Sequence, residues 1–156
     1  MVTIELLDLL SNLRMPSTGL RKLEVSETKG GMEEPMEQAV IEQFATRCEN
    51  MKELKIVCLF DRSRKIGKGG LEGFAELAAQ IIRTSTCLES VRLYNNRFDK
   101  MSAAKILTAA AASPSIEVIE EFNFSESANM TEQDACSALC DFLVDATNLK
   151  KFDMRW

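Results

Sequence analysis

The sequence of 156 residues contains no histidine and only one tryptophan and one tyrosine. Histidine is the most common general base and the usual partner of serine and cysteine nucleophiles, so its absence removes the most common catalytic arrangements. Carboxylates are plentiful, but no spacing in the sequence places a pair of them in one pocket. We therefore expect a protein that is not an enzyme.

Long apolar runs and an excess of positive charge are also missing. Apolar runs such as Ala109 to Ala112 are far shorter than the ~20 residues that cross a bilayer. The first eight residues carry acids and lack the basic and apolar regions of a secretory signal. The net charge of -5 is the opposite of the basic footprint of nucleic-acid binding. We expect a cytoplasmic protein that binds neither membrane nor nucleic acid.

The cysteines and glycines do not indicate a metal or cofactor site. The five cysteines are odd in number and have no Cys-x-x-Cys spacing. Cys136 and Cys140 share one face of an expected helix, but two thiolates without histidine do not make a tetrahedral zinc site. The glycine-rich segment 61–70 lacks the spacing and the Ser or Thr of a phosphate-binding loop. No cofactor and no metal are expected.

Apolar residues make up 46% of the chain, which supports a packed core in a single domain, 1–156. Short runs of alternating apolar and polar residues predict five strands, near 20–26, 51–57, 88–94, 119–125 and 149–155. Apolar residues at helical spacing predict helices near 4–13, 35–48, 71–83, 102–112 and 132–146.

These strands and helices recur at a nearly constant interval. The middle apolar residues of the strands lie 31, 37, 31 and 30 residues apart, at Leu23, Leu54, Val91, Phe122 and Phe152. About six inserted residues at 61–70 account for the long interval. A fixed period with one strand and one helix is typical of a solenoid. A doubly wound α/β sheet also alternates strands and helices, but its strands are almost wholly apolar, whereas these carry polar residues at alternate positions.

The segment from Leu88 to Phe98 carries a more specific pattern. Its apolar residues fall at relative positions one, four, six and eleven, and Asn96 stands at position nine. This spacing resembles one unit of a leucine-rich repeat of the ribonuclease-inhibitor-like class. About four and a half such units, which match the pattern to different degrees, cover nearly the whole chain. The resemblance implies an α/β horseshoe with parallel strands on its concave face and helices on its convex face. It also implies that Asn96 hydrogen-bonds backbone groups in the turn. Only Asn96 matches the asparagine of the pattern, because the equivalent positions of other units hold Thr28, Leu59 and Ser127.

Side chains that point away from the core would form columns on the concave face, where solenoids commonly bind partners. Arg92 and Tyr94 lie near its middle and belong to the residue types that dominate interfaces. The alternative is that opposite charges simply pair across strands, as Glu24 and Lys55 would. The expected partner-binding residues on this face are Lys55, Val57, Arg92, Tyr94, Glu121, Asn123, Lys151, Asp153 and Arg155.

The segment 61–70 offers a second, basic surface. Its cations could contact an acidic partner, or the segment could be a solvated insertion. The residues concerned are Arg62, Arg64, Lys65 and Lys68.

The expected function is a scaffold that binds a protein partner without catalysis. The resemblance leaves two alternatives: a regulator of a partner enzyme, of the GTPase-activating or inhibitor type, and an actin-filament capping module. The pattern begins within a helix and finishes on a strand. We therefore expect a piece of a longer repeat protein, or contact with another chain at one end.

Overall fold

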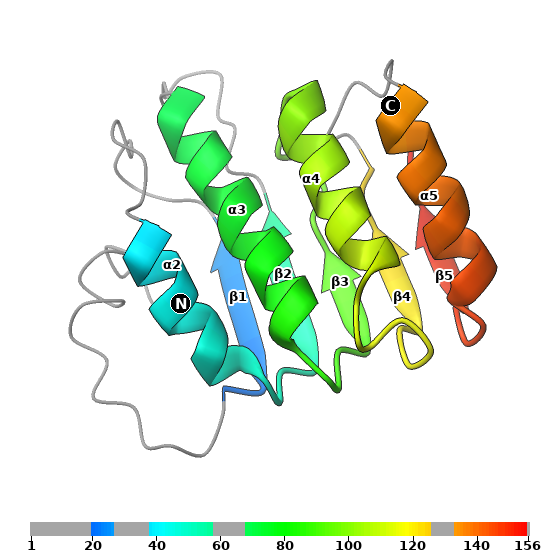
Figure 1. Ribbon diagram of the computed structural model, residues 1–156, viewed down its shortest axis with the longest axis horizontal. Helices are drawn as coiled ribbons and strands as arrows, with labels where there is room; N and C mark the ends of the chain where they lie inside the picture. The colour runs from blue at the N-terminus through cyan, green and yellow to red at the C-terminus, as the bar shows by residue number, and fades with distance from the viewer. Residues whose placement is uncertain (1–19, 27–37, 58–67, 126–132, 156) are drawn as a thin grey trace.

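The computed structural model describes residues 20–26, 38–57, 68–125 and 133–155. They form one parallel five-stranded sheet in which the strands follow each other in chain order (Figure 1). The strands are β1 (Lys22–Ser26), β2 (Glu53–Val57), β3 (Ser90–Arg92), β4 (Glu121–Asn123) and β5 (Lys151–Asp153).

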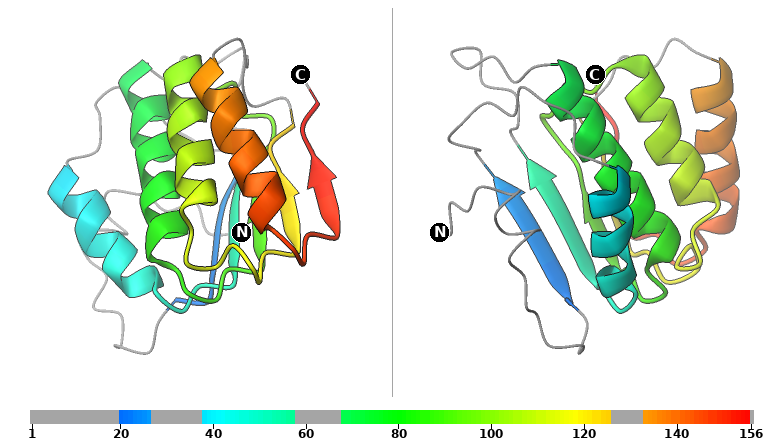
Figure 2. Two further views of the ribbon diagram at one scale, coloured as in Figure 1. Left: turned by 45° about the vertical axis from the view of Figure 1, so that its right-hand side comes forward. Right: turned by 60° about the vertical axis from the view of Figure 1, so that its left-hand side comes forward.

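Helices precede the second to fifth strands. They are α2 (Gln38–Ala45), which continues into the 3-10 helix η1 (Thr46–Cys48), α3 (Lys68–Thr84), α4 (Lys100–Ala111) and α5 (Gln133–Asp145). All four α-helices lie on the same face of the sheet (Figures 1 and 2). Each strand lies inside its expected segment but is shorter at one or both ends. The helix expected at 4–13 falls outside the described residues.

One face of the sheet is covered by no described element, and we call it the open face. A doubly wound sheet differs in two respects, because helices cover both of its faces and its strand order reverses. In the described part of the chain the order never reverses and the helices share one face. The described residues therefore form an α/β layer of one sheet and one row of helices.

The five middle apolar residues predicted from the sequence stand side by side in the sheet. Leu23 pairs with Leu54, which pairs with Val91, and the column continues through Phe122 and Phe152. The interval of 37 residues between Leu54 and Val91 therefore leaves the register unchanged. Because side chains alternate along a strand, this column and the one two residues later both face the helices.

The core fills the space between sheet and helices. Leu54, Val91 and Phe122 are fully buried, as are Phe74 of α3 and Phe142 of α5. The rings of Phe122 and Phe142 have centroids 4.7 Å apart, which joins β4 to the helix that follows it. Burying side chains of this size contributes ~1.5–3 kcal/mol each.

Buried hydroxyl and amide groups link successive units. Ser85 Oγ donates to the Cys48 carbonyl oxygen (2.8 Å), and Ser115 Oγ donates to the Ser85 carbonyl oxygen (2.6 Å). At the other end of the strands, Asn96 is buried and its Nδ2 donates to the Ile56 carbonyl oxygen (2.7 Å). These bonds satisfy backbone groups that the sheet does not pair, so they fix the turns at both ends.

Local signals explain where α4 begins. Asp99 is its N-cap and accepts a hydrogen bond from the Ser102 backbone N–H (2.8 Å), satisfying one of the free donors of the first turn. Just before it, Asn95 and Arg97 adopt left-handed backbone angles, with φ of 61° and 52°. This tight turn lets the Asn96 side chain reach the backbone of β2. Among the described helices, none has the length and apolar character that a membrane span requires.

Candidate functional site

Three columns of side chains cross the open face. They come from the first, third and fifth positions of each strand or of the residues that extend it. The first column is Lys22, Glu53, Ser90, Glu121 and Lys151, and the second is Glu24, Lys55, Arg92, Asn123 and Asp153. The third contains Val57, Tyr94, Ser125 and Arg155, of which Val57 and Ser125 are buried.

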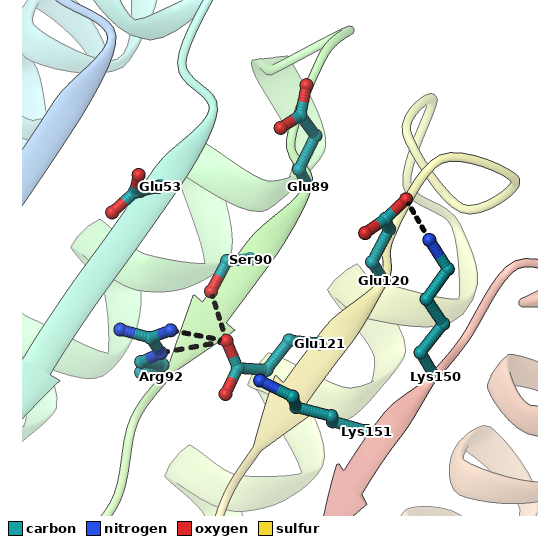
Figure 3. Close-up of a pocket in the computed structure, with 8 residues that line it drawn as sticks. All are labelled: Glu53, Glu89, Ser90, Arg92, Glu120, Glu121, Lys150 and Lys151. Atoms are coloured by element: carbon teal, nitrogen blue, oxygen red, sulfur yellow. Dashed lines mark hydrogen bonds and ion pairs between the residues drawn. The ribbon is translucent and has the colours of Figure 1, made fainter.

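An open depression of about 200 Å³ lies where β2 to β5 begin (Figure 3). Four of its lining side chains are carboxylates and three are cations, so both signs of charge are offered within one small surface. Its lining residues are Glu53, Glu89, Ser90, Arg92, Glu120, Glu121, Lys150 and Lys151.

Arg92 and Glu121 form the best-defined contact in this depression. Both Arg92 Nε (2.9 Å) and Arg92 Nη2 (2.6 Å) donate to Glu121 Oε2, which also accepts from Ser90 Oγ (3.0 Å) (Figure 3). The hydrogen bonds from Arg92 lower the pKa of the Glu121 carboxyl and raise the pKa of the Arg92 guanidinium. Both groups are therefore charged at neutral pH. The pair holds a planar donor group and an acceptor at the centre of the open face.

Opposite charges pair across the neighbouring strands as well. On this side of the sheet, ion pairs join adjacent units at Lys22–Glu53 (2.9 Å), Lys55–Glu24 (2.6 Å), Lys52–Glu89 (2.5 Å) and Lys150–Glu120 (2.7 Å). Their side chains are between 27% and 66% exposed, so each pair contributes only ~0–1 kcal/mol to folding. Such pairs position charged groups at the surface more than they stabilise the sheet.

The structure brings three of the predicted site residues, Arg92, Glu121 and Lys151, into the depression. Lys55 lies next to it in the second column, where its ion pair with Glu24 raises the lysine pKa and lowers the pKa of the glutamate. Tyr94 is half-buried and lies near Lys55 and Arg92. The centre of the predicted face is therefore one continuous surface.

The predicted residues at the β4 and β5 end are held by local bonds. Asn123 Oδ1 accepts from the backbone N–H (3.2 Å) and Oγ (2.9 Å) of Ser125. Asp153 accepts two bonds from Arg155, from Nε at 2.9 Å and from Nη2 at 2.6 Å, and these bonds lower the pKa of the aspartate. Arg155 remains 77% exposed. These side chains do not line the depression.

Val57 does not fit the predicted surface. It is the last residue of β2 and is only 6% exposed, although the alternation along the strand gives it an open-face position. It therefore offers no contact surface. Arg62, Arg64 and Lys65 of the predicted basic segment lie outside the described residues, and Lys68 is the first residue of α3.

Sequence reasoning missed the residues that come immediately before the strands. Glu89, Glu120 and Lys150 line the depression, although each precedes the first residue of its strand. A signal for them was present, since Lys52, Glu89, Glu120 and Lys150 follow the same intervals of 37, 31 and 30 residues as the strands do. Adjacent members of this column carry opposite charges at Lys52–Glu89 and Glu120–Lys150, and these are the two that pair.

This surface offers ionic and hydrogen-bonding groups. A general acid or base at neutral pH needs a pKa near neutrality, whereas the pKa of the Glu121 carboxyl is lowered from 4.5. Among the described residues, no group of His, Cys, Asp or Glu side chains has the arrangement of a metal site. No protein-family model matches the chain, and no curated protein or solved structure matches it either.

Proposed function

We propose that the chain is a leucine-rich-repeat solenoid of the ribonuclease-inhibitor-like class, with the open face as its concave side. Three observations support this proposal. Strand–helix units recur at 30 to 37 residues, the strands pair in parallel in chain order, and the helices share one face. Asn96 also makes the kind of backbone contact expected of the asparagine in such a repeat, through its bond to the Ile56 carbonyl oxygen.

We further propose that this solenoid is a non-enzymatic scaffold that binds a protein partner through the open face. The observation that carries the proposal is the Arg92–Glu121 pair, which lies in a depression over which no described element packs. Both side chains are partly exposed, at 37% and 19%; two hydrogen bonds join them and a third, from Ser90, reaches Glu121. A guanidinium held by hydrogen bonds next to a tyrosine offers contact area at little entropic cost, which is why Arg and Tyr are frequent hot spots.

The mixture of charges indicates what kind of surface the partner presents. Carboxylates occupy the middle of the depression: Glu89, just before β3, and Glu120 and Glu121, where β4 begins. Lys150 and Lys151 line it on the β5 side. An extended anionic ligand would meet the acids, and an extended cationic one would meet the lysines. A folded protein surface or a peptide of mixed charge matches this pattern, with a basic group facing the middle carboxylates.

The proposal is tested with affinity capture from cells of the source organism. Each captured protein is then titrated against purified variants of the chain. Tyr94→Ala and Lys151→Glu change the open face without removing the Arg92–Glu121 pair, and each should weaken binding by about tenfold or more. Arg83→Glu, a charge reversal at an exposed residue of α3 on the helix side, is the matched control and should bind as the unchanged chain does.

The outcome that contradicts the proposal is equally specific. A partner whose affinity is unchanged by both open-face variants, or is reduced by Arg83→Glu, binds elsewhere on the molecule. Circular dichroism and thermal unfolding of each variant show that the loss of binding does not come from loss of the fold.

A further inference from the structure

The residues at which the strands begin do not alternate between the two faces of the sheet. At each junction of neighbouring strands, one carbonyl oxygen accepts two successive N–H groups of the next unit, as that of Lys52 does from Glu89 (2.9 Å) and Ser90 (3.0 Å). The Glu89 carbonyl oxygen accepts in the same way from Glu120 and Glu121. Two residues opposite one on the neighbouring strand form a bulge, which redirects side chains. Successive residues therefore line the depression together.

This arrangement sorts the charges at the strand starts into three zones that follow one another across the sheet. Each zone combines charges of one sign from the residues that begin a strand or come just before it, and Glu53 stands between the first two zones. The first basic zone is Lys22 and Lys52, the acidic zone is Glu89, Glu120 and Glu121, and the second basic zone is Lys150 and Lys151 (Figure 3 shows the last two zones).

The ion pairs within these zones leave binding groups available. Glu89 and Glu120 each accept a lysine through Oε1, and Glu121 accepts its three hydrogen bonds through Oε2. Within the described ranges, no donor reaches the second oxygen of these three carboxylates, and Lys151 Nζ is in no ion pair. A partner can therefore bind the acidic zone and Lys151 without breaking the pairs that are already formed.

The spacing of the zones sets the distances between complementary charges on a partner. Neighbouring strands lie ~4.8 Å apart, so the middle of the acidic zone is about 10 Å from the first basic zone and about 7 Å from the second. An α-helix rises about 1.5 Å per residue, so these distances correspond to about seven and about four residues. Residues separated by four or by seven positions share one face of a helix. A helix that crosses the strands therefore faces all three zones with one side.

An extended segment does not match these distances. It rises about 3.3 Å per residue, so the same two distances correspond to about three and about two residues. Because side chains alternate along an extended chain, a residue three positions away points to the opposite side. An extended segment can therefore present complementary charges to the acidic zone and to one basic zone, but not to both basic zones. The spacing favours a helix as the occupant of the open face.

We propose that the open face binds an α-helix of a partner protein across the strand starts, with a basic residue over the acidic zone and an acidic residue over each basic zone. This inference rests on the proposed scaffold function and names the chemistry of its partner. The two acids stand about seven residues to one side of the base and about four to the other. Because the two intervals differ, the order of charges fixes the direction in which the helix crosses the sheet.

Titration of the isotope-labelled whole chain with synthetic helices, followed by NMR, tests this inference. The matching probe is an alanine-based helix of about 20 residues with one arginine, a glutamate seven residues before it and a glutamate four residues after it. It should shift the backbone signals of Glu89, Glu120 and Lys151.

Two control helices separate the charge order from general attraction. The first has the same composition, but its arginine is moved by two positions and so leaves the common face. The second exchanges the signs of all three charges, which gives a net positive helix that the chain, with its net charge of -5, attracts without specificity. The matching probe should bind about tenfold more tightly than either control, or better.

Variants of the chain locate the contact. Glu120→Lys places a positive charge in the acidic zone and should weaken binding of the matching probe by about tenfold or more. Asp141→Lys, the same change of charge at an exposed residue of α5 on the helix side, is the matched control and should leave the affinity unchanged. Circular dichroism of both variants verifies that the fold is retained.

Several outcomes would overturn the inference. These are equal affinity for the matching probe and either control, no shift of open-face signals up to about 1 mM probe, and unchanged binding to Glu120→Lys. Open-face signals that shift with the concentration of the chain alone would show a second copy as the occupant. A captured partner that depends on Tyr94 and Lys151 but does not compete with the matching probe would leave the scaffold function standing and overturn only the helix. If no captured partner depends on those two residues, the scaffold function fails, whatever the probe does.

Discussion

Asn96 reaches across 40 residues of sequence to the backbone of β2, where its Nδ2 donates to the carbonyl oxygen of Ile56 at 2.7 Å. The side chain is fully buried. The bond therefore joins the turn after β3 to the preceding unit in a place that water does not reach. This side-chain bond adds to the backbone pairing of β2 with β3 in joining the two units.

Replacing Asn96 with alanine should lower the free energy of unfolding by about 1–3 kcal/mol, because the Ile56 carbonyl loses its donor in a buried place. Chemical denaturation with urea measures the change. Asn50→Ala is the matched control, since Asn50 is an exposed asparagine. Equal losses in both variants would show that the buried bond contributes nothing particular to folding.

The Arg92–Glu121 pair makes stability depend on pH in the acid range. The pKa of the Glu121 carboxyl is lowered from 4.5, mainly by the hydrogen bonds from Arg92. A lowered folded-state pKa gives a contribution that is complete above the unfolded value of 4.5 and is lost as the pH falls through the folded value. Glu121→Gln should therefore destabilise the chain at pH 7, and the difference should shrink below pH 4.5.

Urea unfolding of both proteins at several pH values checks this dependence. Glu49→Gln is a suitable control, because Glu49 is exposed and forms no ion pair with a described residue. A difference between Glu121→Gln and the unchanged chain that stays constant from pH 7 to pH 3 would contradict the assignment.

The cysteines should differ sharply in reactivity. Burial raises the pKa of the Cys48 thiol to about 12, and its Sγ donates to the Phe44 carbonyl oxygen at 3.4 Å. Cys136 and Cys140 are exposed on α5. Because the thiolate is the reactive form, iodoacetamide at mildly alkaline pH should modify Cys136 and Cys140 and leave Cys48 unmodified. Peptide mass spectrometry identifies the labelled sites, and labelling of Cys48 should appear only after denaturation.

Two phenylalanines of one column should differ in their contribution to stability. Phe122 is fully buried with its ring centroid 4.7 Å from that of Phe142, so Phe122→Ala should cost about 3–5 kcal/mol. Phe152 is 40% exposed on the edge strand, and Phe152→Ala should cost clearly less in dilute solution. Thermal or urea unfolding compares the two, and equal losses would mean that the β5 end of the core is as closely packed as its centre.

The alternation of apolar and polar residues was sufficient to predict the sheet register. Leu23, Leu54, Val91, Phe122 and Phe152 were expected to align, and all five stand in register. Burial of alternate side chains makes a one-residue slip costly, because a slip would turn the whole apolar set to the other face. The strand ends were less predictable. β3, β4 and β5 are each three residues long, although the apolar pattern extends beyond them.

The candidate site was predictable only in part, because position along a strand does not determine exposure. Val57 occupies an open-face position in the alternation, yet it is buried at the end of β2. Glu89 and Glu120 precede their strands, yet they line the depression. Exposure depends on how the chain enters and leaves each strand, and a pattern of period two carries no information about that. The pairing of Arg92 with Glu121 is diagonal between neighbouring strands and follows from the length of the arginine side chain.

The unbroken register across the 37-residue interval has a consequence for engineering. Since β2 and β3 align regardless of the additional residues between them, this connection should accept a foreign peptide or a small folded domain without disturbing the neighbouring strands. The chain therefore offers an insertion point at which new binding properties could be attached.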